Sequence, residues 1–368
     1  MKLAWRELRR RPGRFVTATA ILTLIASLLM LLGGLLDGLL NGATSAVLAQ
    51  PGELIVYSSG SEESFPRSRV DAAMIETVRG IDGVEDTGGL GVVQLGARVP
   101  GQGERDLLDV VVIGYELPPD DVPEPPDDGS VYADSTLEAE GLEKGMTIEL
   151  GQARIPVEVA GFIDRDLQYS GQGTLWASPS TWREALNANR PGSVLSEGAF
   201  QAVVVDTGSA DPDAVAGRID DATEDATITL TTVDASEAIG GVKEQRSTFN
   251  QIIGVTVLIA VVVVALFFVL LTVERMAMYG VLKAIGARSR TLFAGVLLQA
   301  LVVCAIAWAI GAALAVVLDL VIPVGSIPFT ITPVRLAVSA VLLVVAAALG
   351  SAFSLRRVLR IDPAEAIG

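Results

Sequence analysis

Four long apolar segments are spread unevenly along the chain. They cover residues 15–40, 252–272, 292–322 and 334–355. Each is longer than the roughly 18 apolar residues that are typical of a bilayer-spanning helix. Residues 42–250, between the first segment and the other three, are polar and rich in Gly, Pro and Asp. The spacing therefore predicts four transmembrane helices in a one-plus-three order, with a large soluble domain inserted after the first.

The charges predict which side of the membrane each part faces. Basic residues concentrate in residues 1–14, in the loop 273–291 and in the tail 356–368, whereas the short loop before the fourth helix has none. The positive-inside rule therefore places both termini and the 273–291 loop in the cytoplasm, and the inserted domain outside. Because Arg greatly outnumbers Lys, and Ala, Val and Gly are abundant, we expect a multi-pass protein of a prokaryotic plasma membrane.

These signals define the expected organisation of the chain. We expect a cytoplasmic amphipathic helix at 1–14, transmembrane helices at 15–41, 251–272, 292–322 and 334–355, an extracytoplasmic domain at 42–250, a cytoplasmic segment at 273–291 and a tail at 356–368. The first of these could instead be a simple cluster of flanking positive charge.

Composition excludes several classes of function. Residues 42–250 hold 37 of the 43 acidic residues but 13 of the 27 basic ones, a formal charge of −24, which argues against nucleic acid or anionic lipid as a partner of this domain. The chain has no histidine, so imidazole cannot ligate a metal or act in acid–base catalysis. Its single cysteine, Cys304, lies in the third apolar segment. No nucleotide-binding or metal-binding motif occurs, and we expect neither an enzyme nor a cofactor.

The inserted domain alternates between strand and helix patterns, which predicts an α+β fold. Expected strands are residues 54–57, 84–99, 107–113, 147–150, 155–162, 200–205 and 226–231, and expected helices are 70–79, 135–140, 178–188 and 212–222. The segments 70–93 and 212–230 share a helix-then-strand form. They could pair as one subdomain, with the central strands forming a second.

The first apolar segment carries a glycine ladder, Gly34, Gly38 and Gly42, with Asp37 and Asn41 on the same helical face. Small residues at this spacing let another helix approach closely, so we expect a dimer contact. An acid beside it must be paired or hydrated, so the face could instead border a polar pathway. We find no basic residue in the neighbouring spans, and expect the partner of Asp37 to be water or a basic residue of the inserted domain.

The segment after the second span is amphipathic. An apolar stripe at helical spacing runs along it, comprising Met278, Val281, Leu282 and Ile285. Gly280 and Ala287 leave the opposite face flat, and Gly286 is placed to end the helix. From the residues alone, a stalk and a docking surface are equally reasonable.

Two stretches of sequence suggest a family. The first has Glu-Arg at 274–275 and Gly-Val-Leu-Lys-Ala-Ile-Gly-Ala at 280–287, and the second is the tail Arg-Ile-Asp-Pro-Ala-Glu-Ala-Ile at 360–367. Together they resemble the FtsX-like permeases, which include the MacB, LolC/LolE and DevC-type membrane subunits of type VII ABC transporters. The start of the chain, with Trp-Arg-Glu-Leu at 5–8 and Gly-Gly-Leu-Leu-Asp-Gly-Leu at 33–39, looks most like the DevC and haem-exporter (HrtB) branch.

The resemblance implies a permease that dimerises, as a homodimer or a heterodimer, and binds a separate ABC ATPase that holds ATP and magnesium. Closure of the ATPases would be transmitted to the outer domain (mechanotransmission) and drive export of a hydrophobic or amphiphilic substrate. The residues implied in ATPase coupling are Glu274, Arg275, Met278, Gly280, Val281, Leu282, Lys283, Gly286, Ala287, Asp362 and Pro363. An extracytoplasmic accessory protein is a further candidate partner. The alternative is a non-transporting mechanotransmitter that regulates a cell-wall hydrolase or a sensor kinase.

Overall fold

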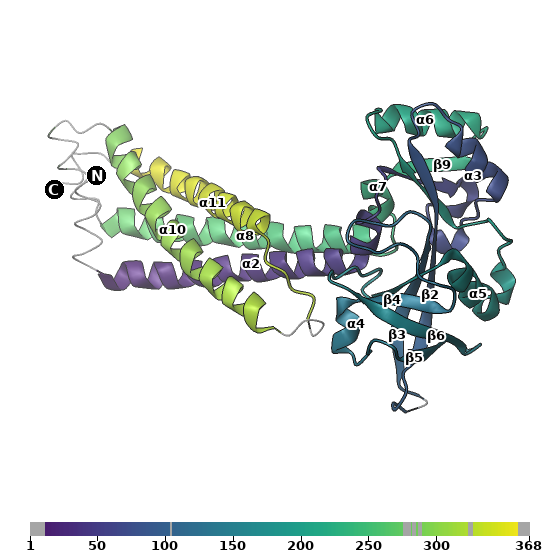
Figure 1. Cartoon of the computed structure of the whole chain (residues 1–368). Coiled ribbons are helices and arrows are strands. Elements are labelled where there is room, and N and C mark those ends of the chain that lie inside the picture. Colours follow the sequence, from purple (N-terminus) through teal and green to yellow (C-terminus); the bar gives the residue numbers. More distant parts are fainter. Residues whose placement is uncertain are drawn as a thin grey trace. The chain divides into compact units, whose positions relative to one another are not determined.

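The computed structural model describes residues 12–103, 105–274, 281, 285, 289–322 and 327–359 (Figure 1). The chain divides into two compact units, one of residues Leu39–Gln245 and one of Met1–Gly38 with Arg246–Gly368. We refer to them as the domain and the helical unit. The predicted helix at 1–14 lies outside the described residues as far as residue 11.

Four long helices confirm the one-plus-three arrangement. They are α2 (Pro12–Leu48), α8 (Val242–Glu274), α10 (Ser289–Val321) and α11 (Pro333–Leu359). Each contains a stretch long and apolar enough to cross a membrane. The protein is therefore an α-helical membrane protein with an α+β domain inserted between its first and second long helices.

Two of these helices are longer than the apolar segments that predict them. α2 continues to Leu48, and α8 begins at Val242 rather than at 251. The added residues include Ala46, Val47 and Val242, whose side chains are buried in the core of the domain. The two helices therefore continue beyond the predicted spans, because burial in protein extends a helix just as burial in lipid does.

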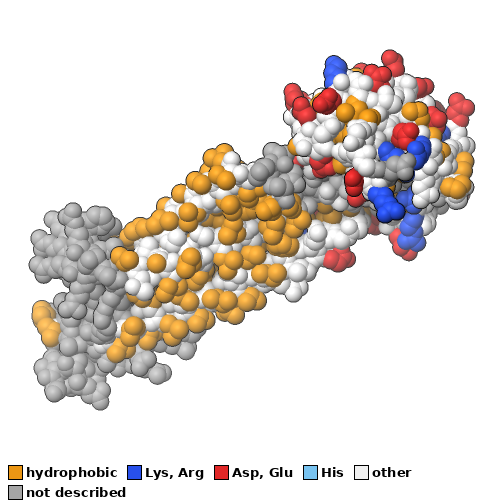
Figure 2. Space-filling model, turned by 90° about the horizontal axis from the view of Figure 1, so that it is seen from below, with side chains coloured by type: hydrophobic (Ala, Val, Ile, Leu, Met, Phe, Trp, Pro, Cys, Tyr) orange, Lys and Arg blue, Asp and Glu red, His pale blue; other side chains and the backbone are white. Residues whose placement is uncertain are grey.

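The helical unit has a small core of its own. Its buried side chains come from all four helices and are Ala18, Leu22, Val264, Phe268, Ala300, Val303, Cys304, Ala307 and Ala347. Glycines bring helices close together there: a Cβ at Gly311 would lie 3.2 Å from Ala26, and one at Gly350 would lie 2.8 Å from the carbonyl oxygen of Val261. Apolar side chains cover much of the remaining helix surface (Figure 2).

Within its described residues the domain forms a nine-stranded sheet in the order β3-β7-β4-β6-β5-β2-β8-β1-β9. The strands are β1 (Leu54–Ser58), β2 (Asp86–Arg98), β3 (Leu107–Tyr115), β4 (Ser130–Asp134), β5 (Thr147–Leu150), β6 (Ile155–Ile163), β7 (Gly173–Ala177), β8 (Ala202–Asp206) and β9 (Thr227–Thr231). Because β2 also pairs with β3, the strands from β3 to β2 close into a ring, and β8, β1 and β9 extend the sheet from β2.

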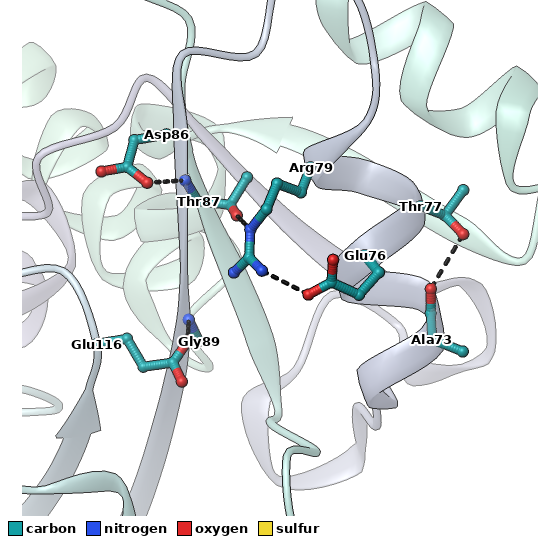
Figure 3. A network of polar contacts seen from close by, with 8 residues as sticks. All are labelled: Ala73, Glu76, Thr77, Arg79, Asp86, Thr87, Gly89 and Glu116. Atoms are coloured by element: carbon teal, nitrogen blue, oxygen red, sulfur yellow. Dashed lines mark hydrogen bonds and ion pairs between the residues drawn. The ribbon is translucent and has the colours of Figure 1, made fainter.

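The strand β2 passes from the ring into the extension near Gly89. Its residues from Leu90 onward pair with β3, while residues 86–90 pair with β8. The Glu116 carboxylate, just past β3, accepts the Gly89 N–H at 2.8 Å, and the Glu116 N–H donates to the Gly89 carbonyl oxygen at 3.1 Å (Figure 3). The Phe200 ring fills the place where a Gly89 side chain would lie. A glycine is therefore required at this branch point.

Helices and loops cover both faces of the sheet. α3 (Ala72–Arg79), α5 (Pro179–Asn189) and α6 (Pro212–Ala222) contact strands and contribute to one core, in which Trp182 stacks on Phe200. Arg79 ties α3 to β2 by donating from Nε to the Thr87 hydroxyl at 3.1 Å (Figure 3). Along β1 the side chains alternate, with Leu54 in this core and Ile55 in a second core on the other face.

The predicted strands and helices of the domain are all present, with small shifts at their ends. Sequence reasoning missed β4, β7, the α-helix α7 (Thr232–Glu237) and three short 3-10 helices. Segment 212–230 lies in the open part of the sheet, whereas segment 70–93 runs from the open part into the ring, where the central strands lie. The two parts share β2, so one continuous sheet runs through both.

Candidate functional site

An ion pair joins the first and the fourth long helices. Arg335, in the first turn of α11, donates from Nε to the Asp37 Oδ2 atom of α2 at 2.9 Å and from a terminal nitrogen to Oδ1. The Thr332 hydroxyl also approaches Oδ2, at 3.5 Å. The side chains of Arg335 and Asp37 are 18% and 22% exposed. This geometry is the two-point form of the arginine–carboxylate pair, which is the strongest and most directional ion pair available to side chains.

The segment before α11 lies along the glycine face of α2. We call residues 327–332 the strap. The Thr330 N–H donates to the Gly34 carbonyl oxygen at 3.1 Å. A side chain on Gly34 would place its Cβ 2.6 Å from the ring of Phe329, and one on Gly38 would collide with the backbone of Pro328. These glycines therefore provide the space that the strap occupies.

Polar contacts also connect α10 with the strap and α11. The Asp319 carboxylate of α10 accepts the Ile331 N–H at 3.2 Å. The Trp308 indole N–H lies 3.2 Å from both the Leu336 carbonyl oxygen and the Ser339 hydroxyl. Thr332 accepts the Arg335 N–H at 3.1 Å, so it caps the N-terminus of α11. The strap thus contacts α2 on one side and α10 on the other.

These contacts bear on two expectations. The partner of Asp37 is Arg335 of the fourth span, which sequence reasoning overlooked, and not water or a residue of the domain, so an unpaired acid no longer supports a polar pathway. The glycine ladder packs against the same chain, with Gly34 and Gly38 covered by the strap and Gly42 by Gln168. The close-approach face of these glycines is therefore occupied by the chain itself, and the dimer contact through them stays a prediction.

The C-terminal end of α2 is fixed to the domain by its backbone. The loop between β6 and β7 donates from the Ser170 and Gly171 N–H groups to the carbonyl oxygens of Ala43 and Gly42, at 3.0 and 2.8 Å. The Gln168 carbonyl oxygen accepts the Ala46 N–H at 3.0 Å. The Ser45 hydroxyl accepts the Gln168 N–H at 2.9 Å. We call this set of contacts the α2 joint. It attaches the helix to the closed ring of the sheet.

The start of α8 enters the same core as the end of α2. Ala235 of α7, Ile239 and Val242 are buried together with Ala43, Ala46 and Val47, against Ile55 and Tyr57 of β1. The Thr232 N–H and hydroxyl, at the start of α7, donate to the carbonyl oxygens of Glu53 and Gly52 at 2.8 and 2.6 Å. Both helices that enter the domain are therefore packed on one face of its sheet.

Three other predicted site residues are described by the structure, namely Asn41, Glu274 and Val281. Asn41 of α2 is exposed. Glu274 ends α8, and the side chains of Val281 and Ile285 are 47% and 78% exposed, with the Ile285 N–H donating to the Val281 carbonyl oxygen at 3.0 Å. The remaining coupling residues lie outside the described residues, namely Arg275, Met278, Gly280, Leu282, Lys283, Gly286, Ala287, Asp362 and Pro363.

A buried carboxylate lies in the domain, away from these helices. Asp134, at the end of β4, accepts hydrogen bonds from the backbone N–H groups and the hydroxyls of Thr136 and Thr174. Burial raises the pKa of this carboxyl above its ordinary value, and the same cause raises the pKa of Asp166 nearby. Among the described residues no group of three or more acidic or cysteine side chains could hold a metal ion.

The helices after the domain also match a family model. Residues 250–363 match the FtsX-like permease C-terminal family. This part of the chain is similar to the FtsX-like permeases. The match begins in α8 and ends just past α11, so it includes Arg335 and the strap. It confirms the resemblance drawn from the two cytoplasmic sequence motifs.

Known relatives match part of this chain. A putative hemin transport system permease protein, HrtB, of Staphylococcus epidermidis is 29% identical over 140 residues, which are 38% of this chain and 40% of the relative. The chain thus matches less than half the length of that relative. An uncharacterised ABC transporter permease of Mycobacterium tuberculosis is 34% identical over 136 residues, covering 34% of this chain and 36% of that protein.

Two solved structures resemble the fold. The extracellular domain of the noncanonic ABC-type transporter YknZ from Gram-positive bacteria has a TM-score of 0.33 and 17% identity, covering 48% of this chain and 98% of that one. The periplasmic region of MacB from Actinobacillus actinomycetemcomitans has a TM-score of 0.35 and 10% identity, covering 51% and 92%.

Proposed function

We propose that this permease is the membrane subunit of an ABC transporter and that it transmits work from a separate ATPase to its inserted domain. The observation that carries the proposal is that α2 and α8, which each contain residues of both units, end in one core of the domain. A displacement of either helix along its axis would have to move β1 and the ring of the sheet with it.

The α2 joint makes this attachment stiff. Its hydrogen bonds are made largely by backbone groups, at 2.8 to 3.0 Å, and a backbone group has no rotamer by which it could yield. Val242 of α8 and Ile239 just before it add apolar packing to the core that holds the end of α2. A rigid helix with a fixed end transmits motion, whereas a flexible linker would absorb it.

The membrane arrangement completes the proposal. By the positive-inside rule, the basic residues favour a cytoplasmic position for the termini and for residues 273–291, where the ATPase and its ATP are found, and an outer position for the domain. The partner ATPase would bind the 273–291 segment with help from the tail. We propose a dimer of this chain as the working unit, and export of a hydrophobic or amphiphilic substrate as its activity.

The experiment is reconstitution of the chain with its ATPase in sealed vesicles. We expect the permease to raise ATP hydrolysis, and Gly280→Trp or Ala287→Trp to abolish this stimulation, because a bulky side chain on the flat face would block docking. A matched control is Val233→Trp, at a 59% exposed position of the domain, which should stimulate like the wild type.

Three outcomes separate the alternatives. Stimulated hydrolysis together with movement of an amphiphile across the vesicle membrane supports an exporter. Stimulated hydrolysis with a rearranged domain but no movement of any amphiphile supports a non-transporting mechanotransmitter. Unchanged stimulation in both tryptophan variants would show that the ATPase docks elsewhere.

A further inference from the structure

We propose that Asp37 and Arg335 are positioning residues that lock the strap onto α2, so that α2, α10 and α11 move as one body when the ATPase acts. The inference rests on the proposed function and adds to it which helices must move together. It follows from the ion pair, from the glycines beneath the strap and from the contacts between α10 and α11.

The ion pair is placed where separating its charges is costly. Both side chains are mostly buried between helices, and each carries a full charge within an apolar segment. A lone charge in such surroundings is strongly disfavoured, whereas a paired one is tolerated. Two hydrogen bonds from one guanidinium also fix the angle between the partners, which a single contact would leave free. The pair therefore holds α11 against α2 in one register.

The glycines make the docking of the strap specific. Gly33 leaves room for the stem of Arg335, and a Cβ there would collide with Arg335 Cδ. Gly34 leaves room for the ring of Phe329, and Gly38 leaves room for the backbone of Pro328. The strap is then bonded to α2 through Thr330. Charge pairing and close backbone approach therefore act on the same short face of α2.

The lock extends to α10 through the other side of the strap. Asp319 accepts the Ile331 N–H, and Trp308 contacts the first turns of α11. A force on α2 is thereby shared with α10 and α11 by directional polar contacts as well as by the apolar core. Loss of the ion pair should leave the helices folded and inserted but allow α2 to slide against the strap.

The first test needs no ATPase. Ile331→Cys is introduced into the full-length Cys304→Ala chain in membranes, and its reaction with a membrane-impermeant maleimide is timed. We expect Asp37→Asn to raise the labelling rate at least tenfold, since the strap loses its anchor. The double variant Asp37→Arg with Arg335→Asp should return the rate toward that of the parent. Gly254→Ala serves as control, because a Cβ at Gly254 has no atom within 4 Å.

The second test uses the reconstituted complex. We expect Asp37→Asn and Arg335→Leu to keep stimulated ATP hydrolysis but to lower substrate moved per ATP at least tenfold, with the charge-swapped double variant restoring the ratio. An unchanged labelling rate in Asp37→Asn overturns the lock. A raised labelling rate with an unchanged ratio also overturns it, since the pair would then be merely structural. If the wild type itself fails to stimulate the ATPase, the proposed function fails, and the labelling rates alone decide whether the lock exists.

Discussion

The domain and the helical unit bury their side chains in different ways. In the domain both faces of the sheet are covered, and Trp176, Trp182 and Tyr57 are fully buried. In each of the four spans, only 22% to 44% of the most apolar 18-residue stretch is buried by the protein itself. The domain therefore carries its own core, whereas the helical unit depends on lipid or partner surfaces and on a few specific contacts. The same substitution should have different effects in the two regions.

The largest difference is expected for truncation of a large apolar side chain. Trp182→Ala should cost about 3–5 kcal/mol of unfolding free energy, because it opens a cavity between α5 and the ring. Leu258→Ala, at a 60% exposed position of α8, should change stability by less than about 1 kcal/mol. Thermal unfolding of the full-length chain in detergent, followed by domain fluorescence, measures both. Equal losses would mean that α8 is packed against protein at this position.

Glycine-to-alanine changes in α2 sharpen the comparison within one helix. Gly38→Ala should cost about 1–3 kcal/mol, since its Cβ would meet the backbone of Pro328, which cannot rotate away. Gly42→Ala should cost less, because its Cβ would lie 2.7 Å from the end of the flexible Gln168 side chain. Gly254→Ala in α8 should be neutral or slightly stabilising. The melting temperatures of the three variants test the order, and a reversal of the first two would contradict the described packing.

Helix capping gives a smaller effect. Thr332→Ala removes the hydroxyl that accepts the Arg335 N–H at the start of α11 and should cost about 1 kcal/mol. Thr332→Ser keeps the hydroxyl and serves as the matched control. Protease sensitivity of the strap in membranes reports the change, which should appear in the alanine variant and be absent in the serine variant.

The smallest effect concerns pH. Because burial raises the folded-state pKa of Asp134, the folded state holds this proton more tightly than the unfolded state. The stabilising contribution is fully present below the ordinary pKa of about 3.9 and is lost as pH rises through the raised value. Asp134→Asn should flatten this part of the pH profile of melting temperature. A slope from Asp166, whose pKa is shifted in the same direction, should remain.

The parts of the fold that could be predicted are those whose sequence pattern lies within one short segment of the chain. The four spans and most strands follow from apolar length and alternation. β7 was missed because Gly173–Ala177 is buried along its whole length and too short to show alternation. β4 was missed because Ser130–Asp134 follows directly on a proline-rich loop. Closure of the ring through β2 depends on pairing between distant segments, which no local pattern reveals.

The candidate site was predicted less well for a related reason. The glycine face of α2 and the need of Asp37 for a partner were correctly recognised from spacing, but Arg335 was overlooked because it begins the fourth apolar segment. One signal could have found it. In a chain with four spans, the end of the first span and the start of the fourth lie on the same side of the membrane, where an acid and a base can meet.

The α2 joint has a consequence for how the domain can vary. Its bonds are made by the backbone of residues 42–46 and 168–171, with Ser45 as the side chain that takes part and Gly42 as the position that needs space. Most side chains on either partner could therefore be exchanged while the attachment is kept. The surface of the domain could in this way change widely while its connection to α2 stays the same.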